Sequence, residues 1–186
     1  YFMNSKDLRA VQHVEKLTAL GVHSLKIEGR TKSFYYCART AQVYRKAIDD
    51  YLKDPKLYEA NMEWYKEEIG KCTYREFTTG FYFGKPTTDS QIYDSNTYEK
   101  DYVYLGITGK ADENGVFDLE QKNKFSVGEI IEIMKPDGRN LEVVVKSICD
   151  EDGNEQESAP HPKQILWVDL GADVDKYDIL RKKEDN

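Results

Sequence analysis

The fold class rests on residues 22–33, which read Val22-His23-Ser24-Leu25-Lys26-Ile27-Glu28-Gly29-Arg30-Thr31-Lys32-Ser33. The apolar residues of 22–28 are Val22, Leu25 and Ile27, and this short segment predicts a β-strand. Gly29 begins a short loop. Ser33 is a typical N-cap, so a helix should begin directly after it. The order is strand, loop, helix.

Amphipathic helices are predicted on both sides of this strand. The earlier one starts at Asp7 after an N-cap at Asn4 or Ser5, and Gly21 follows its end. Its apolar positions, spaced as on one helix face, are Ala10, Val11, Val14, Leu17 and Leu20. The later one ends at Asp54-Pro55, and its buried stripe should be Phe34, Cys37, Ala38, Ala41, Tyr44, Ile48, Tyr51 and Leu52. A further helical stretch spans residues 56–70.

A single strand cannot form a parallel sheet, because its backbone groups would lack partners. The order helix, strand, helix is typical of the end of a βα-repeat barrel. We therefore expect a mostly helical first part that is the last helix-strand-helix unit of a TIM-barrel-like domain. We also expect the chain to be the C-terminal portion of a longer protein. The remaining N-terminal part of the same protein is then an expected partner of this chain.

From Asp101 onward the apolar residues alternate with period two, which is typical of half-buried strands. Turn signals at Asn114-Gly115 and Pro136-Asp137-Gly138 separate the runs. About six short antiparallel strands predict a small β-barrel, so the fold class is α+β. The predicted domains are 1–84, the catalytic-domain tail with a connector helix, and 101–182, the barrel, with a linker at 85–100.

Composition limits the function classes. The 186 residues include 34 acidic and 27 basic ones, a net charge of −7, which argues against a dedicated nucleic-acid module. No apolar run approaches the roughly 18 residues of a membrane span. Three widely spaced cysteines, Cys37, Cys72 and Cys149, favour a reducing, cytoplasmic compartment and provide no metal motif.

Candidate site residues gather where a strand or loop leads into a helix, because functional groups in βα folds collect at such junctions. The residues proposed to carry catalysis are Lys26, Glu28 and Arg30, with Glu28 as a base or as an orienter of Arg30. The residues proposed to bind substrate are Asn4, Ser5, Lys6, Asp7, Lys32 and Tyr35. This mixture suits a polar or anionic ligand, since a helix N-terminus also favours anions.

Simpler interpretations stay open for several of these residues. In the first interpretation, Asn4 or Ser5 only caps a helix. In the second, the aliphatic part of Lys26 packs along the barrel wall. In the third, Glu28 and Arg30 form a purely structural ion pair.

Residues 3–8 and 24–36, Met-Asn-Ser-Lys-Asp-Leu and Ser-Leu-Lys-Ile-Glu-Gly-Arg-Thr-Lys-Ser-Phe-Tyr-Tyr, resemble peptidase family U-32, the collagenase-like peptidases. Residues 37–50 resemble a bacterial branch of that family, and weaker likeness at 78–81 and 122–128 extends it over nearly the whole chain. The resemblance implies a barrel-like catalytic domain followed by a small β-barrel. It also implies an enzymatic parent, of which this fragment alone should be inactive.

For this branch the resemblance implies prephenate-dependent hydroxylation of the wobble uridine of tRNA. The partners it implies for the full-length protein are tRNA and a small anionic substrate. Related members carry an iron–sulfur cluster on cysteines that precede the part seen here, so no metal ligand or cofactor is assigned to this chain. Two alternatives stay open. One is a collagenase-like peptidase, although no nucleophile–base pair is recognisable. The other is a non-catalytic module that binds RNA or protein.

Overall fold

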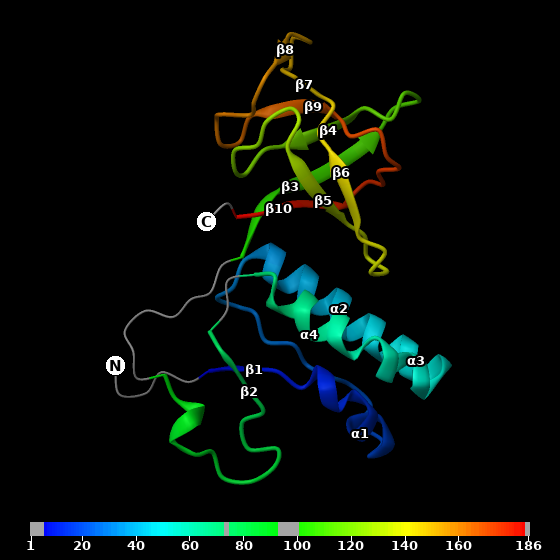
Figure 1. Cartoon of the computed structure of the whole chain (residues 1–186), viewed down its shortest axis with the longest axis vertical. Coiled ribbons are helices and arrows are strands. Elements are labelled where there is room, and N and C mark those ends of the chain that lie inside the picture. Colours follow the sequence, from blue (N-terminus) through cyan, green and yellow to red (C-terminus); the bar gives the residue numbers. More distant parts are fainter. Residues whose placement is uncertain (1–5, 73–74, 93–100, 185–186) are drawn as a thin grey trace. The chain divides into compact units, whose positions relative to one another are not determined.

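The computed structural model describes residues 6–72, 75–92 and 101–184 (Figure 1). The chain forms two compact units, one up to Asp101 and one from Tyr102, and each is described by itself. The second half of the predicted linker, 93–100, lies outside the described residues, as do the predicted caps Asn4 and Ser5.

The first described element is β1, Asp7–Leu8, which pairs in parallel with β2, Phe77–Thr78. A 3-10 turn, η1 (Val11–His13), leads into α1 (Val14–Ala19). The prediction of a helix from Asp7 is therefore wrong at its start, because Asp7 N and Arg9 N donate to carbonyl groups of the β2 segment instead. The helix ends as predicted, with Gly21 at a φ of 71° directly after the C-cap.

The predicted strand at 22–28 is not a strand in the structure. A strand needs a hydrogen-bonded neighbour, and no described residue pairs with the backbone of residues 23–28. The segment lines two cavities together with residues of α2 (Phe34–Lys53). Half-exposed Val22 and Ile27 show that its apolar side is only partly covered.

Helix α2 has the predicted bounds. Ser33 Oγ accepts a hydrogen bond from Tyr36 N at 3.2 Å and caps its start. Asp54 ends it and caps α3 (Pro55–Ala60) by accepting from Lys56 N at 3.0 Å. Asn61 then separates α3 from α4 (Met62–Gly70), so the predicted helical stretch 56–70 is two helices.

The buried face of α2 differs from the predicted stripe. Its buried residues are Tyr35, Arg39, Thr40, Gln42, Val43, Ala47 and Asp50, whereas Phe34, Cys37, Ala41 and Leu52 are exposed. The helix turns its more polar face to α4, because Arg39 and Asp50 find partners there. The predicted core position of Cys37 is therefore wrong. Part of the apolar stripe lines a groove of about 530 Å³ that also contacts Val22, Leu25 and Ile27.

The core of the first unit lies between η1, α1, α2, α3 and α4. Its buried members are Val11, Val14, Val43, Ala47, Tyr58, Tyr65 and Ile69. Tyr58 donates to the carbonyl of Val11 at 2.8 Å, and burial raises its pKa to about 12. Beyond α4, the connector contains β2 and the short 3-10 turn η2 (Thr88–Ser90).

The second unit is a curled antiparallel sheet of eight strands. They are β3 (Tyr102–Ala111), β4 (Phe117–Glu120), β5 (Ile130–Met134), β6 (Leu141–Val144), β7 (Ser147–Cys149), β8 (Glu155–Gln156), β9 (Ile165–Asp169) and β10 (Ile179–Lys183). Their order is β6-β5-β10-β3-β4-β9-β7-β8. The sequence predicted six of these strands and missed β7 and β8, which flank the acidic turn at 150–154.

The chain itself links β6, at one end of this sheet, to β7, the last strand but one at the other end. Only Val145 and Lys146 separate β6 from β7; Val145 N donates to Glu129 O at 3.0 Å, and Lys146 N donates to Asp169 O at 2.9 Å. Strands β6 and β7 thus act as one bent strand, which pairs with β5 at one end and with β9 at the other. The curl encloses fully buried side chains that include Leu105, Phe117, Leu119, Phe125, Ile133, Leu166 and Leu180.

Candidate functional site

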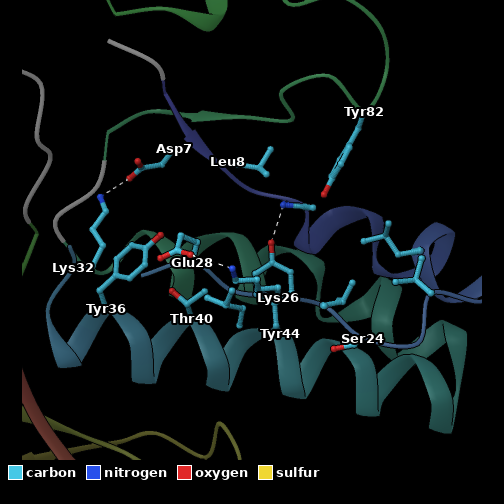
Figure 2. Close-up of a pocket in the computed structure, with 15 residues that line it drawn as sticks. Asp7, Leu8, Ser24, Lys26, Glu28, Lys32, Tyr36, Thr40, Tyr44 and Tyr82 are labelled. Atoms are coloured by element: carbon cyan, nitrogen blue, oxygen red, sulfur yellow. Dashed lines mark hydrogen bonds and ion pairs between the residues drawn. The ribbon is translucent and has the colours of Figure 1, made fainter. Parts of the chain in front are cut away.

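The candidate site is a cavity of about 470 Å³ in the first unit, called here the α2 pocket. Its walls come from β1, segment 22–28, α2 and the turn after β2 (Figure 2). The residues that line it are Asp7, Leu8, Ala10, Leu17, Val22, Ser24, Leu25, Lys26, Ile27, Glu28, Lys32, Tyr36, Thr40, Tyr44 and Tyr82. Mostly apolar walls with a few convergent polar groups are typical of small-molecule sites.

Helix α2 supplies one wall through three side chains. Tyr36, Thr40 and Tyr44 are spaced by four residues, which places them on one helix face (Figure 2). The hydroxyl of Tyr44 accepts a hydrogen bond from Ala10 N at 2.8 Å and thereby fixes the chain after β1 against α2. Burial is the main cause that raises the pKa values of Tyr36 and Tyr44, so both hydroxyls stay protonated at neutral pH.

Thr40 carries a polar atom that the fold leaves without a partner. Its side chain is 5% exposed, and no described residue hydrogen-bonds its Oγ1 atom. A buried hydroxyl without a partner costs about 1–3 kcal/mol. Threonine in a helix populates two χ1 rotamers, so a rotation can turn this hydroxyl toward a ligand in the pocket.

The charged groups of the pocket are paired with each other. Lys32 Nζ lies 3.0 Å from Asp7 Oδ2, and the buried Asp7 carboxylate also accepts from Arg75 N at 3.2 Å. Lys26 Nζ lies 3.5 Å from Glu28 Oε2, with both side chains largely exposed. The two lysines and two carboxylates of the lining therefore compensate each other, and the pocket itself is close to neutral.

The structure brings together four of the predicted site residues, Asp7, Lys26, Glu28 and Lys32. Lys6 lies apart and pairs with Glu76. Tyr35 does not line the pocket; it is buried on the other side of α2, where its hydroxyl donates to Lys71 O.

Arg30 is exposed outside the pocket. Its backbone N–H donates to Glu28 Oε1 at 3.1 Å, and no described carboxylate pairs with its guanidinium group. Sequence reasoning assigned no role in the site to Thr40, Tyr44 or Tyr82. The four-residue spacing along α2 is a signal for the first two, whereas the sequence contains none for Tyr82.

The cysteines do not form a metal centre. Cys37 is exposed, Cys72 is buried beside Arg39, and Cys149 belongs to the second unit. Burial raises the pKa of the Cys72 thiol, although Arg39 acts in the opposite direction. Within the described ranges, no group of three or more His, Cys, Asp or Glu side chains could hold a metal ion. These residues do not fit an iron–sulfur cluster. The helices described also include none that is long and apolar enough to cross a membrane.

Two sequence models of one family match nearly the whole chain. "Peptidase family U32" covers residues 1–92, and "Peptidase family U32 C-terminal domain" covers residues 100–181. The chain belongs to peptidase family U32. The α2 pocket lies in the part that matches the first U32 model, and the curled sheet is the U32 C-terminal domain.

Curated U32 relatives carry two kinds of name. The chain is 44% identical over 185 residues to "tRNA hydroxylation protein P" of Haemophilus influenzae and 41% identical over 185 residues to the protein of the same name of Escherichia coli. Both matches cover 98% of this chain and 39% and 40% of the relatives. A "Collagenase" of Porphyromonas gingivalis is 30% identical over 139 residues, which is 73% of this chain and 33% of the relative.

The chain thus spans about two fifths of the length of the tRNA hydroxylation proteins that it matches. Among solved structures, the C-terminal domain of a putative U32 peptidase of Geobacillus thermoleovorans is similar at 33% identity. That match covers 43% of this chain and 99% of the other, with a TM-score of 0.40.

Proposed function

We propose that this chain is the C-terminal portion of a tRNA hydroxylation protein and that the α2 pocket belongs to its site for the wobble uridine. The observation that carries the proposal is the 44% identity to a protein of that name, which extends over 98% of the chain and so over the pocket. In this proposal the first unit completes a TIM-barrel-like catalytic domain, and the protein acts in the cytoplasm, where tRNA is modified.

The charge balance of the α2 pocket supports a neutral base as its ligand. Within the lining, Asp7 and Glu28 balance Lys32 and Lys26 in number, and the Arg75 guanidinium group outside the lining also contacts Asp7. Each lysine of the lining is therefore paired with a carboxylate and not available for a dicarboxylate. The hydroxyl groups of Tyr36, Tyr44 and Thr40 can hydrogen-bond the polar edge of a planar ring. Enzymes that modify a base take it out of its stack into such a pocket.

Arg30 is the better candidate for the anionic groups of the substrates. Its exposed guanidinium group, without a carboxylate partner among the described residues, can bind a tRNA phosphate or a carboxylate of prephenate as co-substrate. Lys26 and Glu28 form an exposed pair at the edge of the pocket, so Lys26 can exchange Glu28 for a substrate group at little cost. Lys32 is held by Asp7 and has a positioning role.

A peptidase function has weaker support. Peptide hydrolysis needs an activated nucleophile, a metal-bound water or a carboxylate pair. Among the described residues of the α2 pocket, the two carboxylates are paired with lysines. The lining described contains one serine, Ser24, but neither a cysteine nor a histidine that could act as a base. The identity to the collagenase is also lower, 30% over 73% of the chain.

The test is complementation of a bacterial strain that lacks its own tRNA hydroxylation protein. The protein that carries this chain should restore hydroxylated wobble uridine, measured by mass spectrometry of digested tRNA. Unmodified uridine at that position, together with cleavage of a collagen substrate by the purified protein, would reverse the assignment.

Single substitutions then distinguish residues that act in the site from residues that only support the fold. Arg30→Ala and Lys26→Ala should abolish the hydroxylated nucleoside while the melting temperature stays unchanged, because both side chains are exposed. Lys53→Ala, at the exposed end of α2, should keep full activity. If the first two variants unfold instead, their roles are structural.

A further inference from the structure

Three consecutive aromatic residues are exposed in the turn after β2. Phe81, Tyr82 and Phe83, called here the aromatic turn, are 78%, 53% and 59% exposed. Large aromatic side chains mostly occupy cores and interfaces, and contiguous exposed apolar surface often marks an interaction site. The aromatic turn therefore calls for a partner of defined chemistry.

Two lysines accompany the aromatic turn. Lys16 Nζ lies 5.0 Å from the ring centroid of Phe83. The His13 ring packs edge-on against the same Phe83 ring at 4.6 Å between centroids, and burial together with Lys16 lowers the pKa of His13, so this contact is aromatic and not cationic. Lys85 is exposed two residues further on, and residues 77–85 contain no carboxylate. Glu15 is the exposed acid on the neighbouring α1. Local charge thus favours an anionic partner.

The charge of the whole chain is unevenly divided. Residues 1–101 contain 16 basic and 15 acidic residues, a net charge of +1, whereas residues 102–186 contain 11 and 19, a net charge of −8. A polyanion is therefore repelled by the second unit and tolerated by the first. The aromatic turn lies in the unit whose net charge does not repel a nucleic acid.

We propose that the aromatic turn is a stacking platform for unpaired bases of an RNA loop. The proposal rests on the proposed function, because it names how the tRNA would contact the same site. Tyr82 belongs to both features, since it also lines the α2 pocket and points into it (Figure 2). A base that enters the pocket would leave its neighbours in the loop beside Phe81 and Phe83.

The partner is single-stranded rather than duplex RNA. Unpaired bases stack on exposed aromatic rings, and each such contact contributes about 1–3 kcal/mol. Bases in a duplex are already stacked on each other and leave no free face for Phe81. Lys16 and Lys85 would neutralise nearby phosphates, which makes binding weaker at higher salt.

The experiment measures binding of a labelled anticodon stem-loop to the 186-residue chain by fluorescence anisotropy at low salt. Phe81→Ala should weaken binding roughly tenfold. Phe34→Ala is the matched control, since Phe34 is 80% exposed but lies outside the turn and the pocket. Both sites are exposed, so unchanged melting temperatures should accompany both results.

Two results overturn the platform. One is equal affinity of Phe81→Ala and the unsubstituted chain, which includes the case that neither binds. The other is an equal loss of affinity for a loop-free duplex. Complementation separates this proposal from the proposed function. If Phe81→Ala selectively weakens RNA binding but the protein never hydroxylates tRNA, the platform stands and the proposed function is rejected. If the protein hydroxylates tRNA normally but Phe81→Ala does not change RNA binding, the proposed function stands and the platform is rejected.

Discussion

Asp7 shows how one side chain connects fold and site. It is 8% exposed and contacts Lys32 Nζ at 3.0 Å, while Arg75 approaches it through its backbone N–H and its guanidinium group. Asp7 thus holds two segments at one end of the α2 pocket: the loop before α2, through Lys32, and the residues before β2, through Arg75. The sequence placed Asp7 and Lys32 together at one end of the fold, but it predicted substrate contacts where the structure has an ion pair.

Removing this carboxylate should destabilise the first unit. Asp7→Ala leaves two cations near each other in a buried setting and should lower the free energy of unfolding by about 3 kcal/mol. Glu28→Ala is the matched control, because its exposed pair with Lys26 should contribute less than about 1 kcal/mol. Urea unfolding of both variants checks this. Equal losses would mean that the Asp7 pair has no special structural role.

Asp50 predicts a pH dependence. Burial opposes its ionisation, but hydrogen bonds from Tyr65, Lys46 and Asn61 outweigh that effect, so the pKa of Asp50 is lowered. A carboxyl group with a lowered folded-state pKa stabilises the fold above its unfolded pKa of about 3.9, and this contribution is lost as the pH falls through the folded value.

Asp50→Asn should therefore lower stability at pH 7 by about 2 kcal/mol and flatten the decline of stability below about pH 4. Asp49→Asn, next to it but exposed, should leave that decline nearly unchanged. Denaturant titrations between pH 7 and pH 2 measure both. A decline equally steep in Asp50→Asn and the unsubstituted chain would contradict this account of Asp50.

At the scale of elements, helix α2 shows what periodicity can and cannot predict. Its bounds followed from Ser33 and Asp54-Pro55, because caps and proline act locally. Its buried face did not, since an apolar stripe shows amphipathicity but not which element covers it. Polar Arg39 and Asp50 became buried because α4 supplies partners for them, the carbonyl of Glu68 and the hydroxyl of Tyr65.

The strands also differ in how well the sequence predicts them. The principal strands of the second unit were predictable, because one side of each packs on the core and the alternation records this. β1 pairs with a segment about 70 residues away and has two residues, too few for any pattern. Segment 22–28 has the residues of a strand but no described neighbour to bond it. The place of Tyr82 in the pocket was unpredictable for the same reason, because Tyr82 follows β2, whose pairing with β1 no sequence pattern indicates.

The cap of α2 gives a test at this scale. Ser33→Ala removes the acceptor for Tyr36 N and should lower the free energy of unfolding by about 1 kcal/mol. It should also loosen Tyr36 in the pocket. Ser24→Ala, exposed and outside any helix, is the control and should change stability by less than about 0.5 kcal/mol. Thermal unfolding distinguishes the two, and equal behaviour would show that the cap is dispensable.

At the scale of the whole molecule, each unit has its own core. Charge is divided as well, so the net −7 that argued against nucleic-acid binding describes mainly the second unit. The first unit carries the pocket and the aromatic turn and is nearly neutral overall. Composition averaged over both units therefore hid the nearly neutral charge of the first unit.

The two tryptophans allow each unit to be followed separately, since Trp64 belongs to the first and Trp167 to the second. Leu166→Ala removes a fully buried side chain from the curled sheet and should destabilise that unit by about 3 kcal/mol. In single-tryptophan variants, Trp167 fluorescence should report an earlier urea transition while the Trp64 transition stays in place. A joint shift of both transitions would contradict independent cores.

The central claim is that the α2 pocket receives the uridine base. Its most direct measurement is hydroxylated wobble uridine in tRNA from complemented cells, compared between Thr40→Val and Thr18→Val, of which only the first changes the pocket. Because no described residue hydrogen-bonds Thr40 Oγ1, Thr40→Val should keep or raise stability yet lower hydroxylation about tenfold, the equivalent of one hydrogen bond of roughly 1.4 kcal/mol. Thr18→Val should hydroxylate normally. Normal hydroxylation by Thr40→Val would contradict the claim.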